Sequence, residues 1–232
     1  LKKPVKGADG KTTLVAYTQD IAEDKSMLTL LEPYQAFGQQ KLGVEIGETD
    51  GRLEGDRGVV RTKPASLAVL IGLAAMDRTK ADFAVVNAGG VRESLVAGKI
   101  TYKDVLKVQP FGNTLSTIDL NGSEVMAYLI AAAKMSPGSG AFAQFAGISL
   151  EIAGNQVSNV RIKGAPLDPA KTYRMVINNF QAAGGDGYPK LTDHRSHVNT
   201  GYVDADVLRA FITARSPLKA ADYQPGDAVL RR

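Results

Sequence analysis

The stretch "PASLAVLIGLAAMDRTKADFAVVNAGG" (residues 64–90) has the most regular pattern in the chain, and it sets the expected fold class. Residues 64–80 are almost continuously apolar and rich in helix formers, and Pro64 suits the first turn of a helix. Residues 81–90 form a short apolar run that ends in glycines, which is typical of a strand leading into a loop. A helix followed directly by a strand predicts an α/β unit.

Expected helices and strands alternate along the rest of the chain. Residues 1–12 are polar with Gly and Pro and are expected to form a loop, and residues 44–57 begin as a strand before becoming glycine-rich. Gly154-Asn155 indicates a hairpin within residues 147–164. The remaining predicted segments are strands at 12–18, 114–120 and 172–180, and helices at 25–42, 101–108 (N-cap Thr101), 123–134 and 204–215 (N-cap Asp204). The order predicts an α/β (α+β) fold, a mixed β-sheet domain with surrounding helices and a preceding helix.

Composition excludes several classes of function. The chain has 232 residues, enough for one large domain or for a domain with an appendage. Its net charge of +4 is mild and no dense Lys/Arg run occurs, so we expect no nucleic-acid partner. There is no cysteine, and hence no disulfide or thiolate metal site. No apolar run approaches the roughly 20 residues that span a bilayer. The polar start "LKKPVKGADGKTT" resembles the middle of a longer chain.

Catalytic machinery is not evident in the sequence. The only histidines, His194 and His197, lie three residues apart in the polar stretch "TDHRSH". They are either a weak metal site or an exposed loop pair, and the absence of nearby cysteine favours the loop pair. We therefore assign no catalytic residue and no metal ligand to this chain.

Three arginines stand at places suited to an anion. Arg57 and Arg61 are spaced i,i+4, so on a helix or a tight turn both guanidinium groups could face one phosphate. Arg92 follows a strand–glycine junction, and strand ends are common ligand sites in α/β sheets. The alternative is that Arg57 and Arg61 form an ordinary solvated charge pair.

Two phenylalanines lie in glycine-containing loops. Phe111 lies between Pro and Gly in "QPFGN", and Phe180 lies in "INNFQAAGGDGYP" (177–189) together with Asp186. Two such rings could hold a planar base between them, because base–aromatic stacking contributes about 1–3 kcal/mol per base. The alternative for Phe180 is structural: the ring ends a strand, and the glycines merely form a turn.

Long motifs give these residues a family context. "GETDGRLEGDR" (47–57), "AGGVRESLVAGKITYKDVLKVQPFGNT" (88–114) and "FQAAGGDGYP" (180–189) together resemble the C-terminal domain of bacterial periplasmic 5′-nucleotidases of the UDP-sugar hydrolase type. The resemblance implies a larger N-terminal metallophosphatase domain that holds two divalent metal ions and the catalytic Asn–His pair. It also implies three parts of this chain: a tail of that domain (1–24), a connecting hinge helix (25–45) and a substrate-binding domain (46–232).

The resemblance also implies a role for each candidate site residue. Phe111 and Phe180 match the rings that clamp the base, Asn113 matches a residue that hydrogen-bonds it, and Gly140 matches a loop position whose backbone lies against it. Asp186 matches the acid that accepts hydrogen bonds from the ribose hydroxyls. Arg57, Arg61 and Arg92 match the arginines that hold phosphate. Phe37 and Gly38 fall in the matched hinge helix, where Pro33 and Gly38 interrupt an otherwise helical pattern.

The sequence departs from the family pattern at two positions beside the third arginine. The run of three glycines is Ala88-Gly89-Gly90 here, and Glu93 replaces the usual Asp. If Ala88 lay in a tight turn with positive φ, its side chain would be strained and the pose of Arg92 would change.

The expected function is therefore binding of nucleosides and nucleotides, such as AMP, adenosine and UDP-sugars, within a metal-dependent 5′-nucleotidase of the periplasm. The chain alone is expected to be inactive, to need no cofactor of its own and to have its own N-terminal metallophosphatase domain as a partner. The alternative is a free-standing nucleotide-binding module without catalysis.

Overall fold

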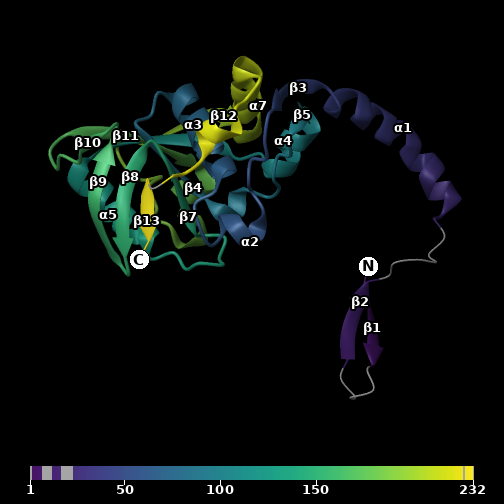
Figure 1. The fold of residues 1–232 in the computed structure, drawn as a ribbon, viewed down its shortest axis with the longest axis horizontal. Coiled ribbons are helices and arrows are strands. Elements are labelled where there is room, and N and C mark those ends of the chain that lie inside the picture. Colours follow the sequence, from purple (N-terminus) through teal and green to yellow (C-terminus); the bar gives the residue numbers. More distant parts are fainter. Residues whose placement is uncertain (1, 7–11, 17–22, 227, 232) are drawn as a thin grey trace. The chain divides into compact units, whose positions relative to one another are not determined.

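The computed structural model describes residues 2–6, 12–16, 23–226 and 228–231. The chain divides into two compact units, Leu1–Gly43 and Val44–Arg232. In the first unit, β1 (Lys2–Lys6) pairs antiparallel with β2 (Thr12–Ala16), and α1 (Lys25–Leu42) follows (Figure 1).

The first unit corrects one prediction and confirms another. Residues 1–12 were expected to form a loop, but Lys2–Lys6 is a strand. Its backbone hydrogen bonds go to a partner strand beyond residues 7–11, and local composition does not reveal such pairing. The strand predicted at 12–18 is present as Thr12–Ala16, and positions 17 and 18 lie outside the described residues.

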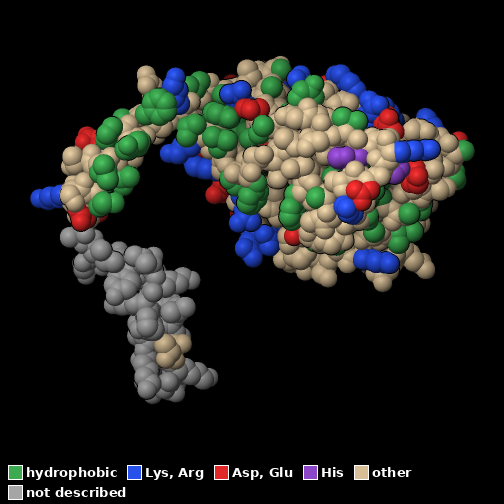
Figure 2. Space-filling model, turned by 180° about the vertical axis from the view of Figure 1, so that it is seen from behind, with side chains coloured by type: hydrophobic (Ala, Val, Ile, Leu, Met, Phe, Trp, Pro, Cys, Tyr) green, Lys and Arg blue, Asp and Glu red, His purple; other side chains and the backbone are tan. Residues whose placement is uncertain are grey.

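Helix α1 is continuous where the sequence suggested breaks. Asp24 caps its first turn by accepting hydrogen bonds from the backbone N–H groups of Ser26 (2.8 Å) and Met27 (3.2 Å). Pro33 lies inside the helix, which spans Lys25–Leu42 and so confirms the helix predicted over these residues. No residue of α1 is buried, and its apolar side chains form the green row along this helix in Figure 2.

A five-stranded mixed sheet forms the centre of the second unit. The strand order is β12 (Val198–Val203), β6 (Thr114–Asn121), β11 (Thr172–Asn178), β4 (Phe83–Asn87) and β7 (Ala143–Ala146). The neighbours β11 and β4 are parallel, and the other neighbouring pairs are antiparallel. This mixed sheet with helices confirms the predicted fold class.

Two smaller sheets complete the strands of this unit. One small sheet has the order β10 (Ala165–Pro166), β9 (Gln156–Ile162), β8 (Ile148–Ala153) and β13 (Val229–Arg231), and the other pairs β3 (Glu45–Thr49) with β5 (Gly98–Thr101). The hairpin predicted at Gly154-Asn155 is present between β8 and β9, and Gly154 has the positive φ (58°) that such turns favour.

The helices begin largely where local capping chemistry places them. Thr101 and Asn121 each form a capping box, with Asp104 and Glu124 respectively, so the predicted cap at Thr101 is confirmed. Pro64 precedes α3 instead of lying in its first turn. The helices are α2 (Arg57–Val60), α3 (Ser66–Thr79), α4 (Tyr102–Val108), α5 (Gly122–Ala133), α6 (Asn179–Ala182) and α7 (Asp204–Arg215), with 3-10 turns η1 (Ala88–Gly90), η2 (Gly185–Gly187) and η3 (Ala220–Tyr223).

The predicted cap at Asp204 is wrong. Val203 is the cap residue of α7, and Asp204 is the first residue inside the helix, with its side chain buried. Its Oδ1 accepts a hydrogen bond from the adjacent Ala205 N–H (2.8 Å), while its own N–H donates to the backbone oxygen of Asn113 (2.8 Å). Burial raises the pKa of this carboxyl to about 6.

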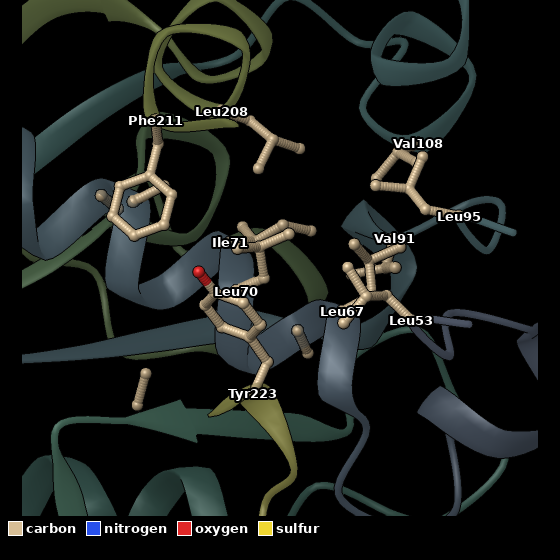
Figure 3. Packing of buried hydrophobic residues seen from close by; sticks show 14 of the residues in the cluster. Leu53, Leu67, Leu70, Ile71, Val91, Leu95, Val108, Leu208, Phe211 and Tyr223 are labelled. Atoms are coloured by element: carbon tan, nitrogen blue, oxygen red, sulfur yellow. The ribbon is translucent and has the colours of Figure 1, made fainter. Parts of the chain in front are cut away.

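Each face of the main sheet packs against its own core. Along β4, Ala84 faces one core while Phe83 and Val85 face the other, as expected from strand alternation. The first core contains side chains of α3 and α7, which point toward one another in Figure 3. The second core lies between the sheet, α5 and the β8–β9 pair. Both faces of the sheet are therefore covered, and its edges and strand ends remain for a site.

Candidate functional site

Sheet topology brings four loops to one edge of the main sheet. Because β4 and β11 are parallel, their carboxyl ends, at Asn87 and Asn178, lie at the same edge. The antiparallel neighbours β7 and β6 begin at that edge, since Asn87 pairs with Ala143 and Asn178 pairs with Leu115. The segments after β4 and β11 and those before β6 and β7 therefore meet there.

These segments surround a cavity of about 410 Å³. Its lining residues are Arg61, Asn87, Gly89, Gly90, Arg92, Phe111, Asn113, Gly140, Phe180 and Asp186. All of the predicted substrate-binding residues except Arg57 are among them, and the predicted hinge residues Phe37 and Gly38 lie in α1. Gly89 and Gly90 were noted in the sequence only as part of the glycine run before Arg92, and Asn87 was not singled out, although its place at a strand end before this run was a usable signal.

Arg61 and Arg92 give the cavity lining a positive charge, and Arg57 lies near Arg61 without lining the cavity. Arg57 lies exposed in α2, and Arg61 is the C-cap residue of that short helix. The backbone N–H of Gly138 donates to the Arg61 carbonyl (2.7 Å), which ties α2 to the loop before β7. Partial burial lowers the pKa of Arg61, and the charges of Arg57 and Arg92 lower it further. An anion between these groups would relieve their mutual repulsion.

Arg92 and Phe111 lie side by side at the mouth of the cavity. The Arg92 guanidinium carbon is 5.5 Å from the centroid of the Phe111 ring, and both side chains are exposed. Ala88 occupies the first position of η1 and does not have positive φ, so the departure from three glycines introduces no backbone strain.

The Phe180 ring rests on a glycine. Phe180 is not part of a strand: β11 ends at Asn178, and Phe180 lies in α6 with 43% of its surface exposed. A Cβ built on Gly185 would be 2.5 Å from the Cζ atom of the ring. The space that a side chain at residue 185 would occupy is filled by the Phe180 ring.

Asp186 is held in an unusual backbone conformation. Its φ is 58°, and Gly184 and Gly187 on either side also have positive φ. The Asp186 Oδ2 atom accepts a hydrogen bond from the Asn87 Nδ2 amide (3.2 Å), and the side chain is exposed to the cavity. Tyr188 links this loop to the opposite wall, because its hydroxyl donates to the Ala141 carbonyl (2.7 Å) beside Gly140.

The segment that carries Asn113 is held by hydrogen bonds to two helices. The carbonyl of Asn113 accepts from the Asp204 N–H, as described above, and Thr114 N–H donates to the Asn179 side-chain oxygen (3.1 Å). The segment before β6 is therefore fixed to α6 and α7.

The histidines have structural partners. His194 Nδ1 is 2.8 Å from Ser196 Oγ, and His197 Nε2 is 3.2 Å from Ser116 Oγ. Both are partly buried, so the expectation of an exposed loop pair is only partly correct: histidine reaches the surface drawn in Figure 2, but each ring is held by a serine. Within residues 2–6, 12–16, 23–226 and 228–231, no group of three or more His, Cys, Asp or Glu is placed to hold a metal ion.

The fold is that of an α/β domain with a cavity at the strand ends of its main sheet. A family model described as "5'-nucleotidase, C-terminal domain" matches residues 45–193, and this chain belongs to that family. It is 55% identical over 225 residues to "Protein UshA" of Yersinia enterocolitica and 51% identical over 232 residues to a "5'-nucleotidase" of Vibrio cholerae. These relationships confirm the resemblance inferred from the motifs.

The chain matches only part of each relative. It is covered to 97% and 100% by these two proteins, but it spans only 41% and 42% of their lengths. Among solved structures, a 5'-nucleotidase precursor from Thermus thermophilus is similar, with a TM-score of 0.74 and 28% identity over 99% of this chain and 54% of that chain. No helix in the described part of this chain has the length and apolar character needed to cross a membrane.

Proposed function

We propose that this chain is the nucleoside- and nucleotide-binding C-terminal domain of a metal-dependent 5′-nucleotidase of the UDP-sugar hydrolase type. The observation that supports this most directly is the cavity, which combines two exposed aromatic rings, a carboxylate and arginines at one sheet edge. Each group has the chemistry to recognise a different part of a nucleoside 5′-phosphate.

Phe111 and Phe180 provide the base site. Both rings are largely exposed, at 57% and 43%, although large apolar side chains are normally buried. A planar base between them would cover this apolar surface and gain about 1–3 kcal/mol of stacking. Asn113 lines the same cavity and offers both a donor and an acceptor to the edge of the base.

Asp186 provides the ribose site. An ionised carboxylate only accepts hydrogen bonds, so it suits the two hydroxyl donors of a vicinal diol. Gly140 lies next to it, since an added Cβ would be 3.5 Å from Asp186 Oδ2, in van der Waals contact. The missing side chain at Gly140 leaves this side of the carboxylate uncovered for a ligand.

The three arginines provide the phosphate site. Arg61 and Arg92 line the cavity, and Arg57 lies close enough to Arg61 to affect its pKa. Guanidinium groups match phosphate geometry in a bidentate way, and they position the substrate without breaking bonds.

The reaction itself is assigned to another domain. The described residues do not fit a two-metal centre, so we attribute the two divalent metal ions to an N-terminal metallophosphatase domain, and we derive no step through them. We further propose a periplasmic location, and a hinge at Phe37 and Gly38 in α1 that turns the binding domain toward the metals. Among the described residues, an added Cβ at Gly38 would meet no atom within 4 Å.

Calorimetry with AMP and adenosine tests the assignment. Arg92→Ala should weaken AMP binding while leaving adenosine binding unchanged, because only AMP carries phosphate. Asp186→Ala should weaken both ligands to a similar extent, because both carry the ribose diol. Equal losses of AMP and adenosine in the Arg92 variant would refute its phosphate role, and a wild-type chain that binds neither ligand would refute the proposed function.

A further inference from the structure

A chain of side-chain amides runs from the backbone of α6 to Asp186. The backbone N–H of Gln181 donates to Asn178 Oδ1 (2.8 Å), and Asn178 Nδ2 donates to Asn87 Oδ1 (2.9 Å). Asn87 Nδ2 then donates to Asp186 Oδ2 (3.2 Å). We call Asn178, Asn87 and Asp186 the amide relay. Its members come from three segments that the fold brings together across 91 and 99 residues of sequence.

The direction of every bond in the relay is fixed by its first donor. A backbone N–H can only donate, so the Asn178 side chain must present its oxygen to Gln181 and its NH₂ group to Asn87. Asn87 must then present its own NH₂ group to Asp186. The relay therefore ends on an acceptor, and an ionised carboxylate fits that position.

The surroundings of Asn87 keep its amide in place. Asn87 is only 3% exposed, so its polar atoms have few alternatives to the relay. Gly89 and Gly90 lie over it: a Cβ built on Gly90 would be 3.1 Å from Asn87 Oδ1, and one built on Gly89 would be 3.5 Å from Asn87 Nδ2. Gly90 thus makes room for the relay, whereas the closest neighbours of an added Cβ at Gly89 would be the Gly140 backbone atoms at 3.2 Å.

We propose that Asn178, which does not line the cavity, is a positioning residue that holds Asp186 as a hydrogen-bond acceptor and so selects ligands with a ribose diol. This inference rests on the proposed function, because it assumes that Asp186 faces the sugar. Asn87 occupies one carboxylate oxygen of Asp186, which leaves the other oxygen for the hydroxyl donors of the ligand. A ligand without those donors gains nothing from the relay.

Asn178→Asp reverses the relay with almost no change in shape. The new carboxylate still accepts from Gln181 N–H, but it has no NH₂ group to offer to Asn87. The Asn87 amide would turn to donate to the new acid, and its oxygen would then face Asp186 Oδ2, acceptor against acceptor. Two facing acceptors repel, so Asp186 would be displaced and would no longer accept from the diol as before.

The measurement is the ratio of the affinities for adenosine and 2′,3′-dideoxyadenosine. In the wild-type chain, we expect adenosine to bind about 10- to 100-fold more tightly, as hydrogen bonds to a charged group imply. In Asn178→Asp, this ratio should fall to below about 3-fold. Both ligands are neutral, so the added charge affects them alike, and general damage to the base site would lower both affinities without changing the ratio.

Asn179→Asp is the matched control. Asn179 is the next residue, and its Oδ1 accepts a backbone bond from Thr114 N–H, which a carboxylate preserves. This variant introduces the same charge one position away but leaves the relay intact, so the ratio should stay at its wild-type value. If Asn178→Asp does not fold, Asn178→Ser keeps a capping hydroxyl for Gln181 N–H while losing the donor to Asn87, and the ratio should again fall.

Two results from the variants would overturn the inference. One is an unchanged ratio in the folded Asn178 variant, and the other is an equal fall in Asn179→Asp. A wild-type chain that binds both ligands with equal affinity would also overturn it, while leaving nucleoside binding itself established. A wild-type chain that binds neither ligand would instead refute the proposed function, and this inference with it.

Discussion

Gly185 offers a sharp test of how the base site is built. In the structure, the position of an added Cβ lies 2.5 Å from Cζ and 2.6 Å from Cε1 and Cε2 of Phe180. Ordinary carbon contacts are about 3.5–4.0 Å, so Gly185→Ala must push the ring away by about 1 Å or more. Gly185 does not have positive φ, so alanine imposes no backbone strain.

The displaced ring should affect binding more than stability. The atoms that clash are at the far end of an exposed side chain, which can swing away without opening a core. Loss of the stacking geometry removes up to about 1–3 kcal/mol, or about 5- to 150-fold in adenosine affinity. Titration calorimetry measures this change, and thermal unfolding checks that the melting temperature stays close to that of the wild type.

A double-mutant cycle with Phe180→Ala shows whether the ring carries the effect. Once the ring is absent, Gly185→Ala has nothing to displace and should cause no further loss of affinity. Gly38→Ala is the control for a glycine without neighbours, and it should bind adenosine as the wild type does. If Gly185→Ala weakened binding equally with and without the Phe180 ring, the explanation through ring displacement would be wrong.

Three further predictions address catalysis, pH and motion. The isolated chain should release no phosphate from AMP with added divalent metal, because its described residues provide no metal centre; metal-dependent release by a preparation free of other phosphatases would contradict this. The raised pKa of Asp204 (about 6, against 3.8) means that the folded chain binds more protons between these values, so its stability falls as pH rises through that window. Asp204→Asn should therefore be more stable than the wild type at pH 7, by up to about 3 kcal/mol in urea unfolding, and should lose this advantage near pH 4; a constant difference across that range would rule out the carboxyl as its cause. In a full-length enzyme whose turnover is limited by domain rotation, Gly38→Ala should lower kcat while adenosine affinity of this chain stays unchanged, and a wild-type kcat would exclude the hinge role.

Local chemistry made several features predictable from the sequence. The cap at Thr101 and the hairpin at Gly154-Asn155 depend on residues within a few positions, and both were predicted correctly. The cap at Asp204 was mispredicted because its carboxylate is buried beside Asn113, a contact that local pattern does not show. Strand β7 was not predicted either, since four fully buried residues show no alternation.

The candidate site shows the same limit. Glycine-rich loops with Phe111 and Phe180 attract attention in the sequence, and the structure brings both to one cavity. The role of Asn87 could not be predicted from the sequence, because its partners Asn178 and Asp186 are 91 and 99 residues away. The sequence also does not show why residue 185 is a glycine. Its side-chain position is occupied by the ring of Phe180, and this contact is seen only in the three-dimensional structure.

The cavity walls come from segments at several strands, which has a consequence for how such a site can evolve. Most of the lining residues lie on segments that leave or enter four different strands, whereas Arg61 lies at the end of α2, and the strands themselves are joined through their backbones. Under the proposed function, a substitution in the segment before β6 should alter the preference for a base without disturbing Arg61. Chimeras that exchange single loops between relatives should inherit the preferences that each loop carries, and the segment after β11 carries those of both Phe180 and Asp186.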